Sequence, residues 1–249
     1  MDQKLFEKVE HKAEILIAAL PYIRDFNQKV VVIEYGCHDY LSPIDEKELM
    51  RDIALLKTVG MKPIVIHHVP MGVDRFRENK RIAKLIELCG IKAIGICGVD
   101  LQTIHMTLDN GYIPVIVPND IDNEMEYIDP KDTALDVAIR MQADKLVYLS
   151  SHRGIWKDKE RTEVYSSLTV QQVRDFLKDG WVTEGVISRV ERGLEAIEQG
   201  VHRVHILDGR IKHALLLEFF SVAGVGTIFI SDEGKLYEHE VERMREANK

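Results

Sequence analysis

The sequence has few cysteines, and their spacing follows no recognisable pattern. Its 249 residues include only Cys37, Cys89 and Cys97, and no two of these have CxxC spacing. An odd count without paired spacing predicts neither a disulfide framework nor a structural zinc motif. We therefore expect buried, reduced thiols.

The chain also lacks long apolar runs and an excess of basic residues. No run approaches the roughly 20 apolar residues that span a membrane, and the charged start MDQKLFEKVEHK has no signal-peptide core. The formal net charge is −8, whereas nucleic-acid binding usually needs a basic face. These observations predict a cytoplasmic protein with neither a membrane nor a nucleic acid as partner.

Along the chain, short apolar runs typical of strands alternate with segments of helical hydrophobic periodicity. Apolar, β-branched runs predict strands at 29–35, 62–67, 92–97, 113–118, 145–149, 203–207 and 226–230. Helical periodicity is found at 45–59, 77–89, 100–110, 132–141, 169–179, 186–199 and 213–220. Such alternation predicts a mainly parallel sheet covered by helices on both faces, a three-layer αβα sandwich. A further helix over 3–26 precedes the first strand, and we expect Pro21 to kink or interrupt it.

The segments after the strands are the expected ligand-binding regions, because open parallel sheets bind ligands at the carboxyl ends of their strands. Residues 34–38 read EYGCH, 67–72 read HHVPMG and 150–154 read SSHRG. Glycines there suit close approach of the backbone to a ligand. Neither a Walker A loop nor a GxGxxG motif is present, so these residues alone predict only an α/β protein with a cleft.

Three histidines near these strand ends raise the alternative of a metal site. His38, His67 and His68 could converge with Cys37, since zinc binds three or four such ligands in one place. Nothing in their spacing requires convergence. We therefore expect ordinary loop histidines and no metal, and keep a metal-dependent enzyme as an alternative.

An ordered series of segments carries a family resemblance. The series includes RDIALLKTVGMKPIVIH, NGYIPVIVP, DTALDVA, ADKLVYLS and HRVHILDGRIKHALLLEFF followed by GVGTIFI. Over nearly its whole length the chain resembles acetylglutamate kinase, of the amino-acid kinase family. The resemblance implies the carbamate-kinase-like form of the αβα fold. It also implies an N-terminal oligomerisation helix (1–28), a shortened acyl-substrate lobe (29–128), a nucleotide lobe (129–231) and a charged tail (232–249).

The resemblance implies phosphoryl transfer from ATP to the side-chain carboxylate of N-acetylglutamate, a step of arginine synthesis, but the matching motifs are altered. The family's first strand ends in a lysine within a KYGG-like motif, and this chain has Glu34 there, with Gly36 retained. The family's phosphate-binding HGGGP loop here begins with His67 and His68 and contains Pro70, which has no N–H to donate.

Two further catalytic positions are also changed. A second family lysine is replaced by Arg189, which keeps the charge but not the compact ammonium. The family's aspartate that organises the lysines persists as Asp132, while a substrate-binding asparagine is replaced by Pro130. Two stretches that form much of the family's substrate pocket and lid are shortened, one after the His67 loop and one after Asp100.

Nucleotide and effector positions are only partly retained. In the family's LTDVPG-like turn, the aspartate position is Ser151 and a glycine remains as Gly154, which implies weak MgATP binding at most. Arginine-inhibited members bind arginine near positions that match Tyr22, His213 and Gly224. The adjacent glutamate of those members is an alanine here.

We therefore expect a catalytically impaired acetylglutamate kinase homologue with a structural, regulatory or small-molecule-sensing role. The resemblance implies a homo-oligomer, a dimer or hexamer, assembled through the N-terminal helix and a sheet face, and leaves room for a regulatory protein partner. The alternative is an active kinase for acetylglutamate or another small acid. A compensating cation such as Arg75, Lys80 or Arg153 near Glu34 would favour that alternative.

Overall fold

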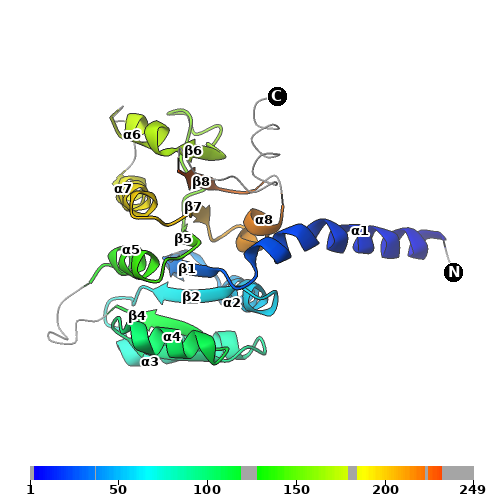
Figure 1. Ribbon diagram of the computed structural model, residues 1–249, viewed down its shortest axis with the longest axis horizontal. Helices are drawn as coiled ribbons and strands as arrows, with labels where there is room; N and C mark the ends of the chain where they lie inside the picture. The colour runs from blue at the N-terminus through cyan, green and yellow to red at the C-terminus, as the bar shows by residue number, and fades with distance from the viewer. Residues whose placement is uncertain (1–2, 37, 119–127, 179–183, 222–223, 232–249) are drawn as a thin grey trace.

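The computed structural model describes residues 3–36, 38–118, 128–178, 184–221 and 224–231 (Figure 1). The strands are β1 Val30–Tyr35, β2 Lys62–His67, β3 Ala93–Cys97, β4 Ile113–Val117, β5 Lys145–Ser150, β6 Ser167–Thr169, β7 Arg203–Asp208 and β8 Thr227–Ile230. The α-helices are α1 Gln3–Phe26, α2 Pro43–Thr58, α3 Arg75–Glu87, α4 Leu101–Asp109, α5 Pro130–Arg140, α6 Val170–Lys178, α7 Glu184–Glu198 and α8 Ala214–Phe220, and a 3₁₀ turn, η1, covers His38–Tyr40.

The strands form one sheet in the order β3-β4-β2-β1-β5-β7-β8-β6. All neighbours from β3 to β7 are parallel, and only the β7–β8 pair is antiparallel. β6 is the one strand that the sequence did not predict. Its three residues extend the edge of the sheet, directly before α6.

Helices cover both faces of the sheet, which confirms the three-layer αβα sandwich. Side chains of α4, α5, α6 and α7 form one core with alternate residues of the strands. Side chains of α2, α3, α8 and the end of α1 form the other. Strand residues divide between the two faces with the expected period of two: Val31, Ile33 and Tyr35 belong to one core and Val32 to the other. No helix among the described residues is long and apolar enough to cross a bilayer.

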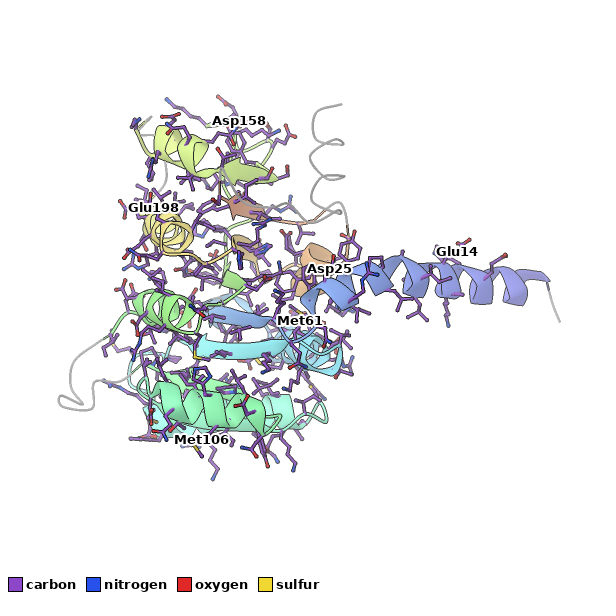
Figure 2. The ribbon with its side chains drawn as sticks, viewed as in Figure 1. Glu14, Asp25, Met61, Met106, Asp158 and Glu198 are labelled. Atoms are coloured by element: carbon purple, nitrogen blue, oxygen red, sulfur yellow. The ribbon has the colours of Figure 1, made fainter. Side chains whose placement is uncertain are left out.

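Helix α1 projects away from the sandwich, and Pro21 does not interrupt it (Figure 1). The proline removes one intrahelical donor, which leaves the carbonyl of Ile17 without its usual partner. Ile17 is exposed, so water can hydrate that carbonyl. Glu14 lies on the projecting part, whereas Asp25 lies where the helix meets the body (Figure 2).

Aromatic packing fixes the base of α1 to the sandwich. Phe26 is 1% exposed, and its ring centroid lies 6.1 Å from that of Phe219 and 6.3 Å from that of Phe220 in α8. The Lys145 ammonium lies 4.3 Å from the centre of the Phe26 ring, a cation–π contact that stabilises a buried charge. The base of α1 is therefore part of the core.

Helix α7 packs closely against the sheet at Gly193, which has no side chain. A methyl group on Gly193 would come within 2.7 Å of the Phe229 ring in β8 and 3.1 Å of Val204 in β7. This close contact sets the height of α7 above the strands. It therefore also places the arginines that α7 carries.

We predict that Gly193→Ala destabilises the protein by about 1–3 kcal/mol, because the added methyl group overpacks the α7–sheet contact. Alanine gains about 1 kcal/mol of helix propensity over glycine, so a neutral or stabilising result would contradict this packing account. Urea unfolding is the measurement. Glu195→Ala, at an exposed position of the same helix, is the control and should change stability by less than about 0.5 kcal/mol.

Candidate functional site

The carboxyl ends of the central strands meet at one edge of the sheet, as parallel pairing requires. Tyr35 in β1 is in register with His67 in β2 and with Leu149 in β5, and Ser150 is in register with Asp208 in β7. The expected segments after these strands are therefore neighbours. They form the candidate site together with the first turn of α5 and the middle of α7.

Glu34 occupies the centre of this edge, on the face covered by α5 and α7. Its side chain is 3% exposed, and its carboxylate lies 3.9 Å from the Arg189 guanidinium of α7. Tyr148 is the register partner of Glu34 on β5. Among the described residues, neither Glu34 Oε2 nor Tyr148 Oη has a hydrogen-bond partner. The structure thus brings together Glu34 and Arg189, which the family resemblance places at two lysine positions, and adds the buried phenol of Tyr148.

Burial dominates the titration of Glu34. Loss of solvation raises the pKa of its carboxyl group to about 7, against smaller lowering effects of Arg189 and Lys131. Burial, followed by the nearby Glu34 charge, also raises the pKa of Tyr148. Both groups therefore favour their neutral forms, and Glu34 changes its charge close to neutral pH.

Around this centre, charged residues are arranged in opposite-sign pairs. Asp132 at the start of α5 accepts a hydrogen bond from Arg192 Nε of α7. Asp129, the N-cap of α5, pairs with Lys131 at 2.8 Å and with Arg192 at 3.7 Å. Asp132 therefore pairs with Arg192, a residue that the sequence did not single out. With Glu34 and Arg189 included, three acids face three cations.

A cavity of about 370 Å³ opens beside this centre, at the ends of β2 and β4. It is lined by residues 67–73, Arg75, Val117, Pro118, Ile128 and Pro130. Both histidines of the predicted substrate loop, His67 and His68, belong to this lining, as does Pro130. The loop that the family resemblance matches to a glycine-rich segment thus surrounds a space large enough for a small ligand.

His67 is held rigidly at the inner end of this loop. It is fully buried, with Nδ1 2.9 Å from the carbonyl of His68 and Nε2 3.2 Å from Asn79 Oδ1. The Asn79 amide nitrogen in turn donates to the Ile96 carbonyl at 3.0 Å. Both ring nitrogens of His67 are thus occupied and are not available to a metal. Asn79 is a residue that sequence reasoning missed, and no periodic signal marked it.

The described residues contain no group of three or more His, Cys, Asp or Glu side chains arranged to hold a metal. Cys37 and the side chain of His38 lie outside the described part of the chain. Lys80 and Arg153, two of the compensating cations considered, are exposed.

The predicted nucleotide residues have close contacts within the protein. The Gly36 N–H donates to the Leu149 carbonyl at 3.0 Å, and a side chain on Gly36 would collide with the Glu34 carboxylate. Gly154 adopts φ +138°, and a side chain there would collide with Thr227 of β8. Ser151 accepts a hydrogen bond from Arg210 through its carbonyl. The left-handed backbone and the contact with Thr227 therefore account for Gly154 without a ligand.

The predicted effector residues lie in different surroundings. Tyr22 is buried at the base of α1, with its ring 6.4 Å from that of Phe26. His213 precedes α8 with φ 60°, and its Nδ1 lies 2.9 Å from Asp52 Oδ1 in α2. Gly224 follows α8 with φ 57°. No described contact joins Tyr22 to His213, and His213 does not cap α8 with its side chain.

Fold and site together define an α/β protein with a polar centre and a small-ligand cavity at the carboxyl edge of its sheet. The family model "Amino acid kinase family" matches residues 80–208. The chain is 31% identical to the acetylglutamate kinase of Carboxydothermus hydrogenoformans, and the alignment covers 89% of this chain and 99% of that protein. The chain belongs to the amino acid kinase family and is similar to acetylglutamate kinases.

Solved structures show the same fold at lower identity. The N-acetylglutamate synthase of Neisseria gonorrhoeae, complexed with coenzyme A and N-acetyl-glutamate, has a TM-score of 0.75 at 20% identity, over 90% of this chain and 64% of that longer one. The carbamate kinase of Giardia lamblia bound to AMP-PNP has a TM-score of 0.64 at 12% identity, over 82% of this chain and 99% of that one. These structures confirm the predicted carbamate-kinase-like fold.

The comparison also reveals a difference in length. The alignment with the Carboxydothermus protein has 290 positions, 41 more than the 249 residues of this chain. At least that many positions of the alignment are therefore gaps in this chain. Within the described residues, only Asn110–Tyr112 separate α4 from β4.

We predict that Glu34 makes the protein less stable as the pH rises from 4.5 to 7. An unfolded chain ionises this carboxyl group near its ordinary pKa of 4.5, whereas the folded protein ionises it at a pKa of about 7. The contribution of Glu34 to the free energy of unfolding is thus greatest below pH 4.5. It falls by about 3 kcal/mol in total as the pH rises to 7, because the unfolded state loses its proton first.

Urea unfolding of the unmodified protein and of Glu34→Gln, at pH 5 and pH 8, measures this effect. Glutamine cannot titrate, so the difference in stability between the two proteins should change with pH in favour of the variant at pH 8. Other titrating groups are common to both proteins and cancel. A difference that does not depend on pH would contradict the buried, protonating Glu34.

Proposed function

We propose that this protein is an acetylglutamate-kinase-like subunit that no longer transfers phosphoryl groups at ordinary rates and instead binds a small molecule in a structural or regulatory role linked to arginine metabolism. The observation that carries the proposal is the buried Glu34 carboxylate opposite Arg189. It occupies the position at which the family resemblance implies a lysine.

Electrostatics explain why this exchange matters. The Coulomb attraction between a lysine and a phosphate oxygen about 4 Å away is roughly 4 kcal/mol at an effective dielectric of 20. An ionised glutamate at the same position repels the phosphate by a similar amount. Even half of that swing, about 4 kcal/mol, slows a reaction roughly a thousandfold. Protonation of Glu34 removes the repulsion but does not supply a cation.

The neighbouring groups offer little compensation. Arg189 faces Glu34, and Arg192 is engaged by Asp132 and Asp129. The Gly36 N–H is used within the sheet. Phosphoryl transfer depends on positioned cations and backbone donors that stabilise spreading negative charge. These pairings therefore favour weak MgATP binding at most.

An active kinase for acetylglutamate or another small acid is the second candidate. The 31% identity along most of the chain favours it. The cavity also contains one guanidinium, Arg75, beside the former glycine-rich loop. If the protein is an active kinase, Arg75 would supply part of the positive charge that is lost where Glu34 stands at the family's lysine position.

A coupled ADP-release assay separates these two candidates. With MgATP and N-acetylglutamate, we expect turnover at least about a thousandfold below that of the Carboxydothermus acetylglutamate kinase assayed in parallel. The parallel enzyme controls for the assay itself. Turnover within tenfold of that enzyme would overturn the proposal and support the active-kinase candidate. Calorimetry with MgATP and with arginine, run on the same preparation, measures whether either ligand binds.

We further propose that α1 joins copies of this chain into a homo-oligomer. On the projecting part of α1, the exposed apolar side chains Leu16, Ile17 and Leu20 lie within about 100° of one another around the helix and form an apolar stripe. Leu16 is 68% exposed. Large apolar side chains gathered on one exposed helix mark an association surface. The firm attachment of α1 at Phe26 favours assembly through a rigid arm.

We expect Leu16→Glu to shift the protein toward smaller species in light scattering coupled to size-exclusion chromatography, because it places a charge in the apolar stripe. Ala18→Glu is the matched control. It adds the same charge about 200° around the helix, on the other side of α1, and should leave the mass unchanged. Equal masses for all three proteins would exclude assembly through this stripe.

A further inference from the structure

Helix α3 is a basic element in an acidic protein. Its 13 residues include five arginines and lysines but only two glutamates, which gives the helix a net charge of +3. The whole chain carries −8, so the residues outside α3 carry −11. A charge separation of this kind orients approaching molecules and attracts acidic ones to α3.

The cations of α3 gather on the side of the helix that faces away from the sheet. The buried side chains of the helix share the opposite side: Glu78, Asn79, Ile82, Ala83 and Ile86. Four exposed cations lie within about 100° of one another around the helix: Arg77, Lys80, Arg81 and Lys84. Because α3 packs on the edge strand β3, it lies at the end of the sandwich opposite to α6 (Figure 1). The basic face is therefore open to a partner.

Two of these four cations are already engaged by acids of the protein. Arg81 pairs with Glu46 and Glu78, both at 2.7 Å, and Lys84 pairs with Glu87 at 3.1 Å. Within the described part of the chain, the side chains of Arg77 and Lys80 form no ion pair. Their charges are therefore available to carboxylates from outside.

The first turn of α3 carries its charges in the order that is unfavourable for a helix. Arg75 and Arg77 are its first and third residues, beside the positive end of the helix dipole, where acidic residues are favoured. The N-cap Asp74 offsets this in part, since it accepts a hydrogen bond from the Arg77 N–H at 2.7 Å. A local rule that is broken at a cost in stability favours a functional reason for these cations.

Exposed apolar side chains lie at both ends of the basic face. Phe76 is 59% exposed, and Leu88, directly after the helix, is 63% exposed. They are twelve residues and about 18 Å apart along the axis, and both lie within about 40° of the sector that the cations occupy. An aromatic side chain next to arginines is a common anchor in protein interfaces.

The length and charge of this face discriminate between kinds of partner. A nucleic acid or an anionic membrane extends well beyond 18 Å and would be repelled by the acidic remainder of the chain. A second copy of the chain, docked through the same face, would bring two basic helices together. A short acidic segment of another protein matches both the length and the charge.

We propose that the exposed face of α3 docks a short acidic segment of a partner protein, with the carboxylates of that segment on Arg77 and Lys80 and an apolar side chain on Phe76. This surface serves the regulatory role proposed above, and its assignment rests on that role. Charge complementarity sets the rate and specificity of such docking, and the apolar contact adds affinity.

Two blocked peptides of the same length, EEDLEEDFEE and QQNLQQNFQQ, are the probes. The full chain is titrated with each in about 0.15 M salt and followed by amide NMR. We expect saturable shifts centred on residues 74–88 with the acidic peptide, and binding of the uncharged peptide at least about tenfold weaker. No saturable shift with the acidic peptide, or equal binding of both peptides, would overturn the proposal.

Variants at exposed positions locate the binding. Arg77→Gln combined with Lys80→Gln should weaken the acidic peptide at least about tenfold. Lys159→Gln combined with Lys178→Gln makes the same change of charge at exposed positions outside α3 and should change the affinity less than about twofold. Equal effects of the two pairs would assign the binding to overall charge and overturn the site. Phe76→Ser should also weaken the peptide, and full binding by this variant would overturn the apolar contact.

Further measurements on the same preparation test the class of partner and separate the docking face from the proposed function. Tighter binding of single-stranded DNA or of phosphatidylserine vesicles than of the acidic peptide would overturn the choice of a protein partner. Turnover at ordinary rates in the ADP-release assay would overturn the loss of phosphoryl transfer and leave peptide binding as measured. Absence of peptide binding, with ADP release also absent, would overturn the docking face alone.

Discussion

The contact between the Glu34 carboxylate and the Arg189 guanidinium joins strand β1 to helix α7 at the candidate site. Glu34 lies at the end of the central strand β1, and Arg189 lies on α7, which reaches that strand end because Gly193 lets the helix approach β7 and β8. At 3.9 Å the two charges attract without a hydrogen bond. A buried acid with so little direct support titrates near neutral pH. The polarity of the whole strand edge therefore depends on where α7 lies.

The same contact changes the roles of its neighbours. Because Arg189 faces Glu34, Asp132 pairs with Arg192, one turn further along α7. Asp129 then holds Lys131 at the start of α5. Each of the three cations described at this centre, Lys131, Arg189 and Arg192, thus has an acidic partner.

The sequence predicted the sheet well because its apolar, β-branched runs are long and clearly bounded. The run at 62–67 coincides with β2, whereas β6, with three residues, is too short to show a period. Glu34 and Arg189 could be placed at the site from the family resemblance. Arg192 carried a signal that was overlooked, since it follows Arg189 by three residues and shares its helix face. Asn79 could not be predicted, because its role comes from packing between α3 and β3 and follows no sequence pattern.

The attachment of α1 has a mechanical consequence. Its 24 residues form a rod about 36 Å long, and the buried end of that rod touches Lys145 at the start of β5. The same strand carries Tyr148 and ends at Ser150, beside the polar centre. Such a rod acts as a lever with its fulcrum at Phe26. A rotation of about 5° there moves the far tip by about 3 Å, so small adjustments of the strand are magnified at the end of the arm.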